Sequence, residues 1–229
     1  MSNNLGQLTK KSARVRSLFV AVLVLGCAFG TVTTAAAQNV TPPTTPPGIT
    51  PPAGNTAYAV GHAFGSQGYV CLPDPNNGGT SWTVNPARPE ATLFVNVFGQ
   101  PVQIITHFAS IDANPNGIAP NPVPLGGNAT WQSSFDSSKV WAAVQAPTKD
   151  HTVVAGTDAS CPNSGAIPCL LLQSVGNQEG PTGGTFLAKA TFVQRLNTKG
   201  GAAPTTACTV GQTQLQGYTA DYFFYRADQ

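Results

Sequence analysis

Three histidines and nine carboxylates are the residues of this 229-residue chain that could carry acid–base or metal chemistry. His62 and His107 each lie in a predicted strand, and Asp136 lies in a turn that follows. If strand pairing brought these three together, they could hold a metal or exchange protons. No ligand spacing supports such a site. We therefore favour two strand histidines bonded to backbone, and we predict neither a metal nor a cofactor.

Hydrolysis of a glycosidic bond would need two carboxylates facing each other across a cleft. Asp136 and Glu179 both lie beside loops rich in Gly or Ser, so they are the first candidates, with His107 as a third. Loop carboxylates are more often turn formers, and Asp136 in the sequence FDSS fits an Asx-turn. The motifs G-x-S-x-G, G-x-G-x-x-G and G-x-x-x-x-G-K are absent, which argues against an esterase-type serine hydrolase and against the usual nucleotide sites.

Three tryptophans, Trp82, Trp131 and Trp141, lie on separate predicted strands. Exposed aromatic rings on a β-sheet can stack on sugar rings, which makes these residues candidates for a binding face. A tryptophan in a β-sandwich is more often part of the core. The sequence does not decide which of the three is exposed.

The cysteines predict crosslinks. Cys71, Cys161, Cys169 and Cys208 would remain after removal of an export signal, and four cysteines allow three pairings. Cys161 and Cys169 enclose a turn-forming loop, which favours a local bridge and leaves Cys71 to pair with Cys208. A CxxC redox motif is absent, and His151 stands at no zinc-ligand spacing from the cysteines.

Residues 1–37 have the three parts of an export signal. A basic region precedes the apolar run 18–25, and Ala35–Ala37 forms an A-x-A cleavage site. The order Val24-Leu25-Gly26-Cys27 also fits a bacterial lipoprotein, in which Cys27 would be lipidated. We favour simple cleavage and a periplasmic or secreted protein. The apolar run is too short to span a bilayer, so we expect no transmembrane helix in the mature form.

Charge argues against nucleic acid as a partner. Removal of residues 1–37 takes four of the eleven Lys and Arg and none of the nine Asp and Glu, which leaves seven against nine and a formal charge of −2. Without a basic surface, attraction to phosphate is weak. With 24 Gly, 20 Pro and only 9% charged residues, the composition is typical of a turn-rich β-protein.

The elements that would position these residues are short strands. Residues 38–54 carry six prolines and predict an extended tether, and residues 55–229 predict one all-β domain, a sandwich or a barrel. Residues 91–97 and 102–108 flank Phe98-Gly99-Gln100-Pro101 and predict a hairpin, and residues 111–127 a long loop. The other expected strands are 57–64, 67–72, 81–84, 129–132, 139–145, 168–173, 185–196 and 215–226.

The chain resembles the domain-of-unknown-function family 3455, which is found in secreted bacterial and fungal proteins. QRLNTKGGAAP, at Gln194–Pro204, is the most specific match. The other matching elements are Gln67–Cys71, Trp82, Ala91–Phe94, Thr106–Phe108, Ala129–Trp131, Phe135–Val140, Ile167–Leu172, Gly184–Phe186, Val193–Ala203, Cys208 and Tyr218–Tyr225.

This resemblance implies one exported β-domain and no particular activity. Some fungal members carry a dehydrogenase label, but the nucleotide fingerprint of such an enzyme is absent here. Cys169 stands where the family usually has an aromatic residue.

We therefore expect a binding or envelope-associated module whose partner is a polysaccharide or another envelope component. The alternative is a secreted hydrolase that uses loop carboxylates and His107. Arg195 is expected to be structural, with Asp221 as its partner.

Overall fold

The described part of the chain consists of antiparallel β-strands. The computed structural model describes residues 40–76, 78–112, 115, 126–144 and 151–229. The described residues all belong to one compact unit. The predicted export signal with Cys27, and most of the predicted loop 111–127, lie outside the described residues. Within them, no helix is both long and apolar enough to cross a membrane.

Nine strands and one short 3-10 turn make up the regular structure of the described residues, which confirms the all-β prediction. The elements are η1 (Pro47–Ile49), β1 (Asn55–Pro73), β2 (Thr80–Val97), β3 (Gln100–Ser110), β4 (Asn128–Ser133), β5 (Lys139–Ala143), β6 (Thr152–Val153), β7 (Cys169–Gln178), β8 (Phe192–Gly200) and β9 (Thr213–Ala227).

Eight of these strands form a closed ring. The order is β5-β4-β3-β2-β1-β9-β8-β7, and β5 also pairs with β7, so the sheet has no free edge at that point. The short strand β6 pairs with β7 as well, at its first residues. All pairings are antiparallel. We call this ring the barrel. Closure leaves few unpaired backbone groups and creates an interior.

The predicted hairpin is confirmed, while two predicted breaks between strands are wrong. Val97 pairs with Gln100 around Phe98 and Gly99, both at positive φ, as a two-residue hairpin turn requires. Residues 57–72 form one strand, and residues 81–97 form another. The register between β1 and β2 shifts between the pairs Gln67–Pro89 and Tyr69–Val84. On its other side, β2 pairs with β3 only from Ala91 onward. The prolines of β2 are tolerated because this part of the strand is irregular and has a free edge.

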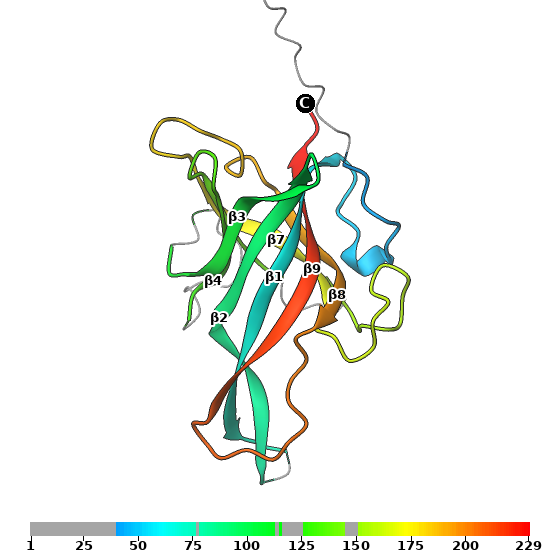
Figure 1. Ribbon diagram of the computed structural model, residues 1–229, viewed down its shortest axis with the longest axis vertical. Helices are drawn as coiled ribbons and strands as arrows, with labels where there is room; N and C mark the ends of the chain where they lie inside the picture. Colours follow the sequence, from blue (N-terminus) through cyan, green and yellow to red (C-terminus); the bar gives the residue numbers. More distant parts are fainter. Residues whose placement is uncertain (1–39, 77, 113–114, 116–125, 145–150) are drawn as a thin grey trace, which may run out of the picture. The chain divides into compact units, whose positions relative to one another are not determined.

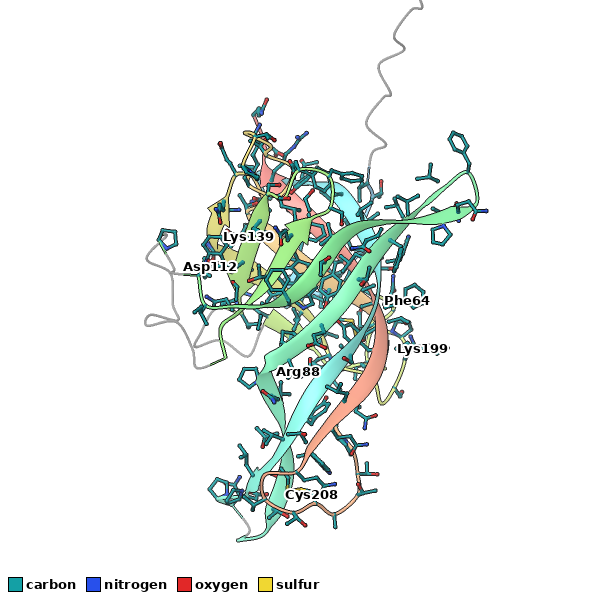
Figure 2. All side chains as sticks on the ribbon, turned by 60° about the vertical axis from the view of Figure 1, so that its left-hand side comes forward. Phe64, Arg88, Asp112, Lys139, Lys199 and Cys208 are labelled. Carbon is teal, nitrogen blue, oxygen red and sulfur yellow. A yellow bond between two sulfur atoms is a disulfide. The ribbon has the colours of Figure 1, made fainter. Side chains whose placement is uncertain are left out.

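Strands β1, β2 and β9 continue beyond the barrel as an extension (Figure 1). The Cys71–Cys208 disulfide ties the extension to the segment between β8 and β9, and Figure 2 shows Cys208 at its far end. Trp82 Nε1 donates to Thr206 O at 2.9 Å and adds a second tie. Cys161 and Cys169 form the other disulfide, so both predicted bridges are present.

The barrel wall separates two cores. Leu93, Trp131 and Phe224 belong to the inner core, whereas Leu171 and Phe223 belong to the outer core. Phe223 and Phe224 are neighbours in the chain and point to opposite faces because side chains alternate along a strand. The sheet is therefore buried on both sides along part of β7, β8 and β9.

Part of the proline-rich segment covers the outer core. Ile49 is fully buried, and its carbonyl oxygen accepts a hydrogen bond from Gln194 Nε2. Gln194 Oε1 in turn accepts from the Tyr225 hydroxyl at 2.6 Å. We expected residues 38–54 to be a free tether, but the part around Ile49 packs on the barrel. Prolines disfavour longer helices and strands, yet they do not prevent burial of an apolar side chain beside them.

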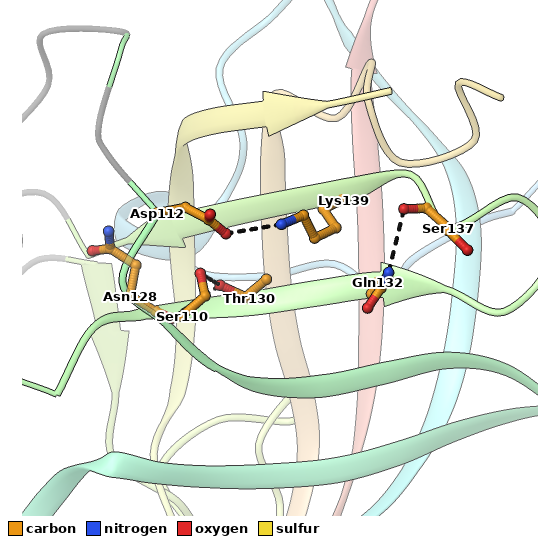
Figure 3. Close-up of polar contacts among 7 residues, drawn as sticks. All are labelled: Ser110, Asp112, Asn128, Thr130, Gln132, Ser137 and Lys139. Atoms are coloured by element: carbon orange, nitrogen blue, oxygen red, sulfur yellow. Dashed lines mark hydrogen bonds and ion pairs between the residues drawn. The ribbon is translucent and has the colours of Figure 1, made fainter. Parts of the chain in front are cut away.

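Polar pairs mark the outward side of β4 and β5 (Figure 3). The hydroxyl oxygens of Ser110 and Thr130 are hydrogen-bonded at 2.6 Å, and Gln132 Nε2 donates to Ser137 O at 3.4 Å. Lys139 forms an ion pair with Asp112 at 3.0 Å. Since Thr130 and Gln132 lie on the outward side, Trp131 between them points into the barrel.

Candidate binding site

A cavity of about 410 Å³ lies inside the barrel. All eight strands of the ring contribute residues to its lining, as an interior space requires. Small inward side chains leave this room unfilled, among them Ala129 on β4 and Ala142 on β5. The volume falls in the range of pockets that hold small molecules.

Two stacked rings form one wall of the cavity. His107 on β3 lies directly opposite Trp131 on β4, and their rings are nearly parallel, with centroids 4.3 Å apart. Tyr222 on β9 lies 5.5 Å from His107 and 5.6 Å from Trp131, between ring centroids. Trp131 Nε1 is buried and has no hydrogen-bond partner among the described residues. The wall is thus aromatic, with an unused donor.

His107 is neutral at physiological pH. Its Nδ1 lies 2.8 Å from Thr130 O, and because a carbonyl oxygen only accepts, Nδ1 carries the proton. Burial lowers the pKa of the ring to about 4, with a further lowering from the charge of Arg195, against an opposing effect of the bond to Thr130. Nε2 is therefore an acceptor, and no described residue bonds to it.

Two tyrosine hydroxyls meet beside this wall. The hydroxyl oxygens of Tyr218 and Tyr222 are 3.0 Å apart. Burial raises the pKa of Tyr218, and the neighbouring Tyr222 raises it further, so the Tyr218 hydroxyl keeps its proton. Each hydroxyl carries one proton, and only one proton can lie between the two oxygens. The other proton has no acceptor among the described residues, and a ligand in the cavity reaches it where Tyr222 carries it, because Tyr222 and not Tyr218 is part of the described lining.

Arg195 is the one charged residue among the described residues that line the cavity. Its Nε and Nη2 donate to Pro168 O at 3.2 and 2.8 Å, which fixes the guanidinium. On its own strand it lies opposite Tyr222 of β9 on one side and Leu170 of β7 on the other. The cavity therefore combines apolar walls with one held positive charge.

The expected pair between Arg195 and Asp221 is wrong. Leu196, not Arg195, lies opposite Asp221, so Arg195 and Asp221 point to opposite faces of the sheet. Asp221 instead bonds to His62 Nδ1 at 2.6 Å and accepts from Asn197 Nδ2 at 2.7 Å. A shift of one residue in a strand separates groups that sequence reasoning had joined.

The three hydrolase candidates do not meet in the cavity. His107 lines it, while Asp136 and Glu179 are not part of its described lining. Asp136 lies in the turn between β4 and β5, where it accepts from Phe186 N and from the amide and hydroxyl of Ser138. Partial burial would raise the pKa of Asp136, but these hydrogen bonds outweigh that effect and lower the pKa to about 2. Its role in the structure is to hold the turn.

The tryptophans do not form an exposed face. Trp131 is buried in the cavity wall, and Trp141 is buried against Gly176. Trp82 is half-buried and uses its indole N–H in the extension. No group of three or more His, Cys, Asp or Glu in the described part of the chain is placed to hold a metal ion.

Sequence reasoning missed the contribution of β9 to the site. Tyr218, Ala220, Tyr222 and Phe224 alternate along this strand, and all belong to the inner core. This alternation was visible in the sequence. The outward residues Phe223 and Tyr225 of the same strand are also apolar and buried. They interrupt the alternation of apolar and polar residues that would otherwise mark one inward face.

Of three comparisons with known proteins, one finds a match, and its description names no ligand. Neither the search of curated proteins nor the search of solved structures finds a match. The model of one family, described as a protein of unknown function (DUF3455), matches residues 52–226. That match begins just before β1 and ends within β9, so it covers the whole barrel. On the strength of this match, the chain belongs to the DUF3455 family.

Proposed function

We propose that this protein is an exported binding module whose barrel takes up one small, largely apolar molecule. The observation that carries the proposal is the cavity of about 410 Å³ with residues from all eight strands in its lining. Barrels of eight strands are just wide enough to fill with side chains or to hold one small ligand. Apolar walls with a few placed polar groups are the usual build of such a site.

The unused polar atoms of the cavity support binding. Trp131 Nε1 lacks an acceptor among the described residues, and leaving a buried donor unpaired costs about 1–3 kcal/mol. His107 Nε2 and one proton of the Tyr218–Tyr222 pair are also unused there. A bound molecule with oxygen atoms could satisfy groups of this kind.

The same contacts favour binding over hydrolysis. A hydrolase of the kind considered above needs a carboxylate near His107, and the described lining of the cavity contains none. Asp136, the strongest carboxylate candidate, has its oxygens occupied by Phe186 and Ser138.

A polysaccharide partner has less support than a small molecule. Trp131 and Trp141 are buried, so the tryptophans offer no flat exposed platform for a sugar chain. Two disulfides support a protein that works in an oxidising compartment, as the predicted export signal implies.

Titration of the protein with the neutral apolar fluorophore N-phenyl-1-naphthylamine tests this function. We expect saturable binding of one probe per chain and competition from other small apolar molecules. Ala129→Leu fills the cavity and should weaken probe binding by about tenfold or more, since it removes room from a preformed pocket. Ala203→Leu, at an exposed position, is the matched control and should bind as the wild type does.

Binding of the fluorophore by the wild type that does not saturate would overturn the proposed binding function. Equal affinity for the fluorophore in the wild type and in the folded Ala129→Leu variant would overturn it too. If Ala129→Leu does not fold, Ala142→Leu on β5 repeats the test from another wall of the cavity, because Ala142 points inward.

A further inference from the structure

We propose that the ligand of the cavity is a monocarboxylate with an apolar body, and that Arg195 binds its carboxylate. This inference rests on the proposed binding function and names its ligand class. The starting point is that Arg195 is the single charged residue in the described lining. Its guanidinium is held in place by Pro168 O beside largely apolar side chains, a setting suited to binding one anion.

The guanidinium has a free edge of the right shape. Nε and Nη2 both donate to Pro168 O, which uses one N–H of each. Three of the five N–H groups remain, two on Nη1 and one on Nη2, and no described residue accepts from them. The N–H groups that Nη1 and Nη2 direct away from the side chain are parallel. Such a pair matches the two oxygens of a carboxylate.

The neighbours of Arg195 favour the same ligand. Tyr222 lies directly opposite it on β9, and the Tyr218–Tyr222 pair has one hydroxyl proton to give. Leu170 lies on its other side and also lines the cavity. A ligand oxygen at the guanidinium therefore has one hydroxyl donor on one flank, while most of the other lining side chains are apolar.

The remainder of the cavity would contact the apolar part of the ligand. The stacked rings of His107 and Trp131 are part of its wall, and Leu172 and Ala129 also line it. His107 is neutral and so does not compete with Arg195 for the anion. With one positive charge available, the second carboxylate of a diacid would be buried without a partner, which disfavours diacids.

Isothermal titration with a matched pair of probes tests the inference: 2-naphthoic acid, which is an anion at pH 7, and its neutral isostere 2-naphthamide. We expect the wild type to bind the acid about tenfold or more tightly than the amide, because hydrogen bonds to charged partners are stronger than neutral ones. Naphthalene-2,6-dicarboxylate should bind more weakly than the monoacid, because its second charge lacks a partner.

Variants at Arg195 assign the preference to this residue. Arg195→Gln should lower affinity for the acid about tenfold or more and lower affinity for the amide much less, so that the preference for the acid is lost. Arg195→Lys, which keeps the charge but not the fork, should retain part of the preference. Arg88→Gln is the matched control, since Arg88 is exposed and pairs with Glu90 outside the cavity.

The outcomes separate this inference from the binding function. If the neutral fluorophore binds and Ala129→Leu weakens it, but the wild type binds acid and amide equally, the carboxylate assignment is wrong and the binding function stands. An unchanged acid preference in Arg195→Gln has the same meaning. If Arg195→Gln does not fold, the acid–amide ratio in the wild type and in Arg195→Lys decides. Failure of every probe to bind overturns both proposals.

Discussion

His107 stacks face to face on Trp131 across β3 and β4, at a centroid distance of 4.3 Å, and donates through Nδ1 to Thr130 O. The stack is buried inside the barrel, at the wall of the cavity. It places an ionisable ring where charge is disfavoured, so the stability of the protein should depend on pH through this residue.

We predict a loss of stability as the pH falls from about 6.5 to about 4. Burial lowers the pKa of His107 to about 4, against 6.5 for the unperturbed ring. Between these values the unfolded chain binds a proton that the folded chain does not, so the free energy of unfolding decreases as the pH falls. The full effect is on the order of 3 kcal/mol.

Urea unfolding at pH 7 and at pH 4.5 measures this effect. In His107→Phe, which keeps a flat ring and does not titrate, the loss between the two pH values should be much smaller than in the wild type. The pKa of Asp136 is lowered from 3.8 to about 2, so the stability that its ionised form provides is lost only at pH values below this window. Equal pH dependence in the wild type and the variant would show that His107 is not the group responsible.

The two disulfides should differ in their contribution to stability. Cys71 and Cys208 are 137 residues apart in sequence, and Cys161 and Cys169 are 8 apart. In the chain-entropy model the first bridge contributes about 5 kcal/mol and the second about 2.5 kcal/mol. We expect Cys71→Ala/Cys208→Ala to lower the unfolding free energy more than Cys161→Ala/Cys169→Ala does, as measured by urea denaturation. The reverse order would mean that burial of the local bridge outweighs loop length.

Gly176 should not tolerate a side chain. A Cβ atom built there would lie 2.3 Å from carbons of the Trp141 indole, which lies over the glycine. Gly176→Ala should destabilise the protein by about 1–3 kcal/mol through overpacking. Gly217→Ala is the matched control, because a Cβ there meets nothing closer than 4.0 Å. Thermal unfolding followed by tryptophan fluorescence compares them, and equal melting temperatures would contradict the predicted clash.

Ile49 should stabilise the barrel although it lies in the proline-rich segment. It is fully buried in the outer core. Ile49→Ala should lower the free energy of unfolding by about 2–5 kcal/mol, as expected for removal of a buried aliphatic side chain. The matched control is Ile111→Ala, since Ile111 is 85% exposed. Urea denaturation decides, and a small effect at Ile49 would mean that the segment detaches in solution.

Much of the fold could be predicted from local pattern. Alternating apolar residues predicted most of the strands, and Phe98-Gly99 between two apolar runs predicted the β2–β3 hairpin. The predicted strand 185–196 is wrong in its first part, because β8 begins at Phe192, and β6 was not predicted. Cysteine spacing predicted both disulfides. These features depend on residues near each other in the chain or, for the cysteines, on a small number of possible pairings.

The site depended on long-range pairing that no local pattern reveals. Closure of the ring requires β5 to pair with β7, and neither strand signals its partner. The register of β8 on β9 set Arg195 opposite Tyr222 and placed Asp221 on the other face, beside His62. A change of one residue in that register would reverse both faces.

By itself, the sequence determined an all-β domain of this family, its two crosslinks and its one predicted hairpin. Only the tertiary structure decided that the sheet closes into a barrel, that His107 and not His62 faces the interior, and that Arg195 stands there without a carboxylate in the described lining. The physical reason is that the period of a strand specifies which residues share a face. Which strands pair, and in which register, is specified by the packing of the whole chain.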